Sequence, residues 1–172
     1  MISAKQCLEY NVRNDPRAKD NIYYFPHFVL AHGQRFQKHP NQHQYFSSLK
    51  TMGMCFWNAL ELIMECEHEK LMYAEGYAYT QDEPMLFHHG WAVTPNGECV
   101  DPTWSHGIDY FGVVFDGRYA AEIFLRQKKF AGVIDNEDDG WPLLTGKATN
   151  WRPKVMPITN PPSHSPPAPS LL

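Results

Sequence analysis

The sequence contains no long hydrophobic run and no surplus of positive charge. No stretch of the 172 residues approaches the ~18 consecutive apolar residues of a membrane span, and the start, MISAKQCLEYNVRND, has no apolar signal-peptide core. The formal net charge is −4 and the pI is about 6.1, so the chain lacks the basic surface that nucleic acid or an anionic membrane would attract. These absences predict a cytoplasmic protein with neither a nucleic-acid nor a membrane partner.

Patterns typical of metal sites are also missing. The four cysteines lack zinc-finger spacing, and four in a chain of this length indicate reduced thiols rather than a disulfide framework. The acidic run NEDDG lacks the alternating oxygen ligands of a calcium loop. One alternative is a zinc site built from His88, His89, Cys99 and His106. Adjacent strand residues such as the two histidines point to opposite faces of a sheet, so we expect no metal and no cofactor.

The composition predicts one folded domain followed by a tail. With 43% hydrophobic and 14% aromatic residues, the chain has enough apolar side chains for one core. Seven of the 14 prolines lie in the last segment, PKVMPITNPPSHSPPAPSLL. We therefore expect a single domain over residues 1–152 and an extended, mobile proline-rich tail over residues 153–172.

A helix that begins near Thr51 is predicted to carry the first reactive residue. Thr51 or Gly53 is suited to cap its start, which places Cys55 in or near the first turn. One face of this helix is apolar, with Cys55, Ala59, Leu62, Ile63 and Cys66 at helical spacing. Cys66 lies about three turns along that face and is interpreted as a core residue, which makes it a control for Cys55.

Strands are predicted on both sides of this helix. Residues 1–20 are read as an edge strand followed by a loop. Asn21–Ala31 is rich in aromatic and β-favouring residues and is read as a strand, which its proline would confine to a sheet edge. Tyr73–Tyr79, Met85–Thr94 and the run IDYFGVVF have strand composition, and a second helix, capped by Asp116 or Gly117, follows. The predicted fold class is α+β, with the cysteine-bearing helix packed on an antiparallel sheet.

The turn at residues 94–97 decides which histidine faces Asp101. Its sequence, Thr-Pro-Asn-Gly, predicts a three-residue hairpin loop with a left-handed Gly97. Trp91 then pairs with Asp101, and His89 lies diagonally opposite at roughly 7–8 Å, a distance that side chains bridge. A two-residue loop would select His88 instead, because a shift of one residue reverses every side chain.

Three residues in this order support thiol chemistry. Cys55 at a helix N-terminus is favoured as a thiolate by the helix dipole. An imidazole such as His89 takes the thiol proton, and a carboxylate such as Asp101 holds the imidazole in the correct tautomer.

The motifs CFWNALELI, YAEGYA and HHGWAVTPNGECVDPTW resemble the core of the transglutaminase-like and papain-like cysteine enzymes. In that core a cysteine-headed helix precedes a G-Y strand, an H-x-W strand and a D-P-T strand. The resemblance covers about a third of the chain. It implies that Cys55 is the nucleophile, His89 the base and Asp101 the orienting acid.

Together these features predict a cysteine hydrolase or acyltransferase that acts on an amide or ester. The substrate is expected to be a protein or peptide, with a small amide as the alternative. The backbone N–H of Cys55 and the side chain of Gln42 or Gln44 are candidate oxyanion donors, with Gln44 taken as the substrate-binding residue. Trp91 is expected to line the cleft on the His89 face. The other class to consider is a catalytically silent binding module that keeps the fold and docks partners through its proline-rich tail.

Overall fold

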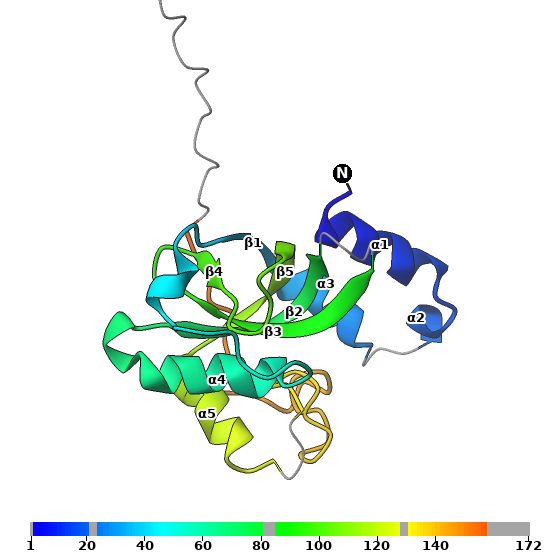
Figure 1. Ribbon diagram of the computed structural model, residues 1–172. Helices are drawn as coiled ribbons and strands as arrows, with labels where there is room; N and C mark the ends of the chain where they lie inside the picture. Colours follow the sequence, from blue (N-terminus) through cyan, green and yellow to red (C-terminus); the bar gives the residue numbers. More distant parts are fainter. Residues whose placement is uncertain (1, 21–23, 81–84, 128–130, 158–172) are drawn as a thin grey trace, which may run out of the picture.

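A five-stranded sheet that closes into a small barrel forms the centre of the protein (Figure 1). The computed structural model describes residues 2–20, 24–80, 85–127 and 131–157. Within them, the strands are β1 (Gln34–Lys38), β2 (Met72–Thr80), β3 (Leu86–Val93), β4 (Glu98–Val100) and β5 (Gly107–Phe115). Their order around the barrel is β1-β4-β3-β2-β5, with a parallel β1/β4 pair and antiparallel pairs elsewhere.

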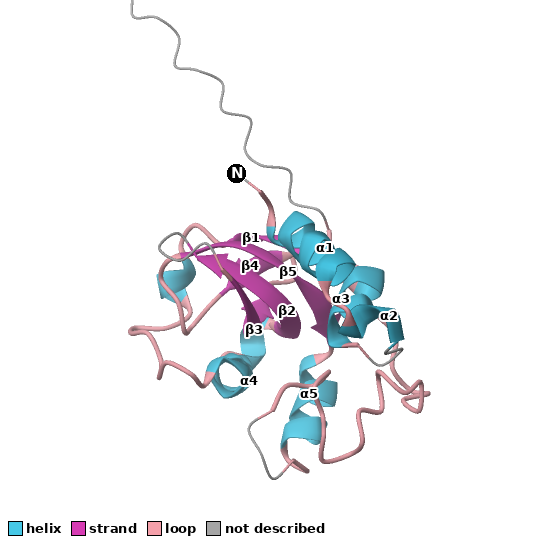
Figure 2. Ribbon diagram, turned by 90° about the vertical axis from the view of Figure 1, so that its right-hand side faces the viewer, coloured by secondary structure: helices cyan, strands magenta, loops and turns pink. Residues whose placement is uncertain are grey.

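Helices cover the barrel in two groups, as Figures 1 and 2 both show. The first group is α1 (Ala4–Asn14), α2 (Arg17–Asp20) and α3 (Phe25–His32). The second is α4 (Cys55–Glu65) with α5 (Gly117–Phe124), and the short 3₁₀ helices η1 (Gln42–Gln44) and η2 (Glu67–Glu69) complete the described helices. None of the helices in the described residues has the length and apolar character needed to cross a membrane. The fold class is α+β, as predicted.

Alternation along the strands separates two apolar layers. Ala74, Trp91, Tyr110 and Val114 fill the barrel interior. Trp91 fits there because β5 carries a glycine at position 112, where a Cβ would lie 2.5 Å from the indole ring. The outer face packs on buried residues of α4 and α5, namely Ala59, Leu60, Leu62, Ile63, Ala120, Ile123 and Phe124. The packing of the outer apolar layer against α4 and α5 holds α4 beside the sheet, next to β3.

The N-terminal expectations were wrong. A helix, α1, replaces the predicted edge strand and loop, because Ser3 and Gln6 form a reciprocal capping box and Ala4 and Leu8 bury one helical face. Asn21–Ala31 was predicted as a strand, yet its described part forms α3. A proline in the first turn favours a helix start because its missing N–H has no partner to lose there.

Strand β1 lies in a segment with no predicted element. Only Phe36 of this strand is buried, so the sequence shows no alternation that would mark it. Its pairing with β5 on one side and β4 on the other supplies the hydrogen bonds that define it.

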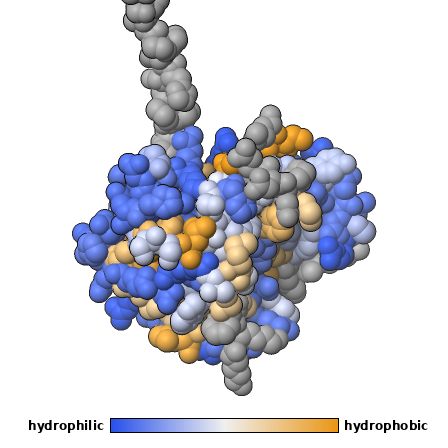
Figure 3. Space-filling view, in the orientation of Figure 1, coloured by the Kyte–Doolittle hydropathy of each residue, from blue (hydrophilic) through white to orange (hydrophobic). Residues whose placement is uncertain are grey.

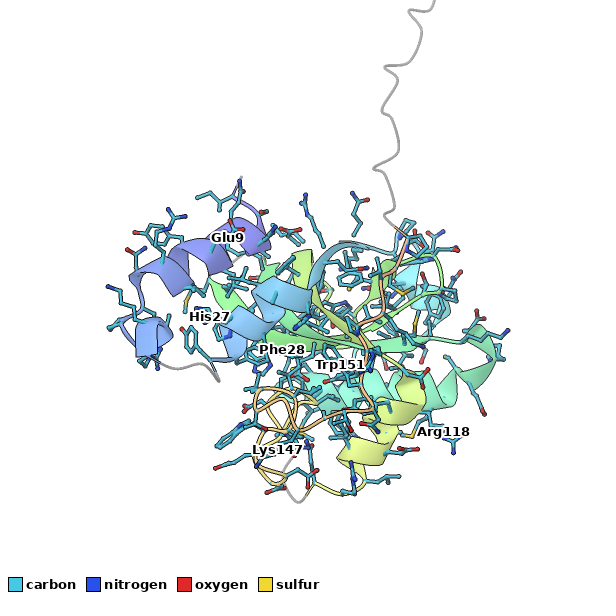
Figure 4. All side chains as sticks on the ribbon, turned by 180° about the vertical axis from the view of Figure 1, so that it is seen from behind. Glu9, His27, Phe28, Arg118, Lys147 and Trp151 are labelled. Carbon is cyan, nitrogen blue, oxygen red and sulfur yellow. The ribbon has the colours of Figure 1, made fainter. Side chains whose placement is uncertain are left out.

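The predicted boundary at residue 153 lies too early. Lys154 forms a β-bridge with Val114, and Met156 is only 7% exposed because it packs into the barrel interior. Just before this segment, Trp151 lies against Phe28 of α3 at a ring distance of 5.1 Å (Figure 4). Residues 153–157 therefore belong to the folded domain, and the rest of the predicted tail lies outside the described residues.

Candidate active site

Cys55 is the first residue of α4 and is partly exposed. The predicted caps are wrong, since the N-cap is Met54 and it makes no side-chain cap. Asn58 fixes the start of the helix instead: its Nδ2 donates to the Thr51 carbonyl at 2.7 Å and to Thr103 Oγ1 at 3.1 Å. The helix N-terminus is thereby tied to the segment that follows β4.

The β3/β4 hairpin has the predicted geometry. Gly97 has a φ of +84°, and its N–H donates to the Thr94 carbonyl at 2.9 Å. The Thr94 N–H donates to Glu98, also at 2.9 Å, and residues 92 and 93 pair with residues 100 and 99. This is the register in which Trp91 stands opposite Asp101, so the turn prediction is confirmed.

His89 and Asp101 meet in the interior. His89 Nε2 lies 2.9 Å from Asp101 Oδ2, and both side chains are 0% exposed. The same carboxylate oxygen accepts from the Tyr110 hydroxyl at 2.8 Å. The other oxygen accepts from the backbone N–H groups of Thr103 at 2.9 Å and Trp104 at 3.0 Å. This full set of donors suits an ionised carboxylate.

His89 and Asp101 stabilise each other in their charged forms, as an imidazolium and a carboxylate. Burial lowers the pKa of His89, but the charge and hydrogen bond of Asp101, with a further contribution from Cys55, outweigh it and raise that pKa to about 9. Burial likewise raises the pKa of Asp101, but His89, the backbone N–H groups and Tyr110 together bring it below its usual value. Both directions favour the charged pair at neutral pH.

The second ring nitrogen of His89 is the one available to the thiol. Nε2 is engaged with Asp101, while Nδ1 is buried and makes no hydrogen bond with the described residues. Cys55 contributes to the raised pKa of His89, which indicates that the thiol lies near the ring. The structure therefore brings Cys55, His89 and Asp101 together.

Comparison of the chain with protein-family models, with curated proteins and with solved structures gave no match. The resemblance to transglutaminase-like and papain-like enzymes therefore depends on the motifs and geometry of this chain alone.

Trp104 covers the imidazole. Its ring stacks on His89 with a centroid distance of 3.8 Å and an angle of 12°, and Phe87 meets its edge at 5.5 Å. An indole face stabilises a cation within about 6 Å, so this stack favours the imidazolium. Trp104 directly follows the D-P-T motif in the sequence. Figure 3 shows hydrophobic residues across the middle of one face, surrounded by hydrophilic ones.

The two predicted substrate-binding residues differ in exposure. Trp91 is 0% exposed inside the barrel, against Phe36 at 5.7 Å and Tyr110 at 5.3 Å, so it does not line a surface cleft. Gln44 is exposed on η1. Gln42, two residues earlier, is buried and accepts from the Asp101 N–H at 3.2 Å. Gln42 is therefore the glutamine that reaches Asp101.

The zinc alternative fails on geometry. His88 projects from the opposite face to His89 and lies 2.9 Å from Glu75, whereas Cys99 is inside the barrel. Within the described residues, no group of three or more potential ligands is arranged to hold a metal ion.

Cys66 and Cys99 lie in surroundings that differ from those of Cys55. Cys66 is the C-cap residue of α4, and its thiol contacts the Tyr45 carbonyl at 3.6 Å. Burial raises the pKa of this thiol. Burial inside the barrel raises the pKa of Cys99 well above its usual value. Both environments disfavour the thiolate, so these cysteines are unsuited to act as nucleophiles.

Proposed function

We propose that the protein is a thiol-dependent hydrolase or acyltransferase that acts on an amide or ester bond. Cys55 is the nucleophile, His89 the base and Asp101 the orienting acid. The observation that carries this proposal is the buried His89–Asp101 pair, in which His89 Nε2 lies 2.9 Å from Asp101 Oδ2, together with a Cys55 thiol near enough to the ring to contribute to its raised pKa. A base held between a thiol and a carboxylate is the arrangement that nucleophilic catalysis requires.

The reaction proceeds in two steps. The Cys55 sulfur attacks the substrate carbonyl carbon and forms a C–S bond, the C–N or C–O bond breaks, and His89 gives its proton to the leaving group. A thioester remains on Cys55. Water or another acyl acceptor then attacks the thioester carbonyl and transfers its proton to His89; the C–S bond breaks, and Cys55 is released as the thiolate beside the imidazolium. Asp101 stays ionised throughout and stabilises the imidazolium.

The oxyanion of each step needs hydrogen-bond donors. The N-terminus of α4 carries no side-chain cap, so the backbone N–H of Cys55 is the first donor. Gln42 is a better second donor than Gln44, because it is anchored at Asp101 while Gln44 is exposed.

The order of elements supports a transglutaminase-like or papain-like core. A cysteine-headed helix is followed by β2 with its Gly-Tyr pair, β3 with His89 and β4 leading to Asp101. A protein or peptide is the expected substrate, with a small amide as the alternative. All four cysteines are free, which supports a reducing compartment such as the cytoplasm.

A catalytically silent binding module is the second candidate. It is favoured by the complete burial of His89 and Asp101 and by the indole that covers the ring. An enzyme must expose Cys55 and one face of His89 to its substrate, whereas a binding module has no such need.

An activated ester separates the two. The protein is incubated with p-nitrophenyl acetate, and nitrophenol release and the intact mass are followed. We expect an early burst of nitrophenol and an acetyl group on Cys55, which Cys55→Ala removes and Cys66→Ala leaves unchanged. Equal nitrophenol release by wild type and Cys55→Ala would rule out the enzyme and leave the binding module.

A further inference from the structure

A second carboxylate and imidazole lie on the sheet face opposite to His89 and Asp101. Glu75, in the middle of β2, is 0% exposed and its Oε1 lies 2.9 Å from His88 Nε2. Its other oxygen accepts from the Tyr73 hydroxyl at 3.3 Å, from the Ile134 N–H at 3.1 Å and from the Val133 N–H. A buried carboxylate with this many donors is held in a fixed position.

Two aromatic rings hold His88 in addition to its hydrogen bond. Its ring contacts Phe25, the first residue of α3, at 4.2 Å and Phe56 at 4.8 Å. Phe56 follows Cys55 in the first turn of α4. The side chain of His88 is 29% exposed, so most of its surface is used in these contacts.

The first turn of α4 also rests directly on β3. A Cβ at Gly90 would lie 3.1 Å from the Phe56 Cα and 3.2 Å from the Tyr73 hydroxyl, so only glycine permits this approach. Three consecutive residues of β3 therefore act together: His88 contacts Phe56, His89 is the base of the triad, and Gly90 supports the turn that carries Cys55.

We propose that Glu75 and His88 are positioning residues that hold Phe56, and through it Cys55, at reacting distance from His89. This inference rests on the proposed function. The hydrogen bond that His88 donates to Glu75 fixes the His88 ring, the ring fixes Phe56, and Phe56 sets where the sulfur lies. A misplacement of about 1 Å at a reacting group lowers a rate on the order of 10²-fold, so small movements of Phe56 matter.

The test is the rate at which iodoacetamide alkylates Cys55 in the full chain, measured by site-resolved mass spectrometry. Glu75→Gln and His88→Gln are compared with Glu69→Gln and His68→Gln, an exposed glutamate and histidine pair 3.3 Å apart on η2. Each variant is assayed from pH 5 to pH 10 at a temperature well below its own melting temperature, so that only folded protein is compared.

We expect Glu75→Gln and His88→Gln to slow alkylation at neutral pH by about tenfold or more and to change the shape of the pH profile, because Cys55 is further from the imidazolium. The two η2 variants should match wild type. A lower melting temperature with an unchanged rate and pH profile would reduce the pair to a structural role and overturn this inference alone. A Cys55 that is no more reactive than Cys66 in wild type would overturn the proposed function and this inference with it. If Glu75→Gln does not fold, His88→Gln decides, since it leaves the backbone donors of Glu75 in place.

Discussion

Asp101→Asn removes the charge beside His89 while keeping the shape of the side chain. The remaining carbonyl oxygen can still accept from the backbone N–H groups of Thr103 and Trp104, so the segment after β4 should keep its path. The substitution therefore tests the electrostatics of the site separately from its fold.

The size of the effect follows from the pKa of His89. That pKa is raised from 6.5 to about 9 against the opposing effect of burial. The difference corresponds to roughly 3 kcal/mol in favour of the imidazolium, most of which depends on Asp101. In Asp101→Asn the buried ring should be neutral at pH 7.5, and a neutral ring does not stabilise a thiolate. Alkylation of Cys55 should slow by about 100-fold.

The assay is alkylation by iodoacetamide at pH 7.5, with thermal unfolding recorded on the same samples. Asp109→Asn is the matched control, because Asp109 is also a buried carboxylate but pairs with Arg35 at 2.6 Å and not with His89. It should lower stability and leave the alkylation rate unchanged. An Asp101→Asn rate within threefold of wild type would refute the electrostatic account.

The pair should also make stability depend on pH. Because the pKa of His89 is raised in the folded state, its contribution to stability is complete below pH 6.5 and is lost as pH rises through about 9. The free energy of unfolding measured in urea should therefore fall over that range for wild type and fall much less for Asp101→Asn. Gly90→Ala should push the first turn of α4 away from β3, because the new methyl group would lie 2.8 Å from the Phe56 ring. Both the melting temperature and the rate of Cys55 labelling should fall. A normal labelling rate would show that the turn can yield. Met156→Ala should cost about 2–5 kcal/mol by opening a cavity in the barrel, and truncation after Arg152 at least as much, whereas unchanged unfolding would mean that residues 153–157 are not part of the core.

The part of the site that depends on local rules could be predicted from the sequence. The turn at 94–97 fixed the parity of the hairpin, because Gly97 takes a left-handed conformation there, and parity alone selects His89 over His88. The helical pattern after Thr51 placed Cys55 in the first turn of α4. Both features are set by a few neighbouring residues.

Features set by distant contacts were missed. The path of the chain after β4 decides that Trp104 stacks on His89 at 3.8 Å, whereas Trp91 is buried inside the barrel, and no local pattern distinguishes the two tryptophans. Gln42 and Gln44 differ by their orientation on a 3₁₀ turn, which no local pattern marks. In α1 a local signal was present but overlooked, since Ser3 and Gln6 form a capping box.

The central claim is that Cys55 is an activated nucleophile, and competition among the four cysteines tests it most directly. Native protein is treated with limiting iodoacetamide from pH 5 to pH 10, and the label on each cysteine is quantified against the unfolded chain. We predict that Cys55 is labelled first and well below pH 8, that Cys66 and Cys99 stay unlabelled over the same range, and that His89→Ala abolishes the advantage of Cys55. Labelling of Cys55 no faster than that of Cys66, or an advantage that survives His89→Ala, would contradict the claim.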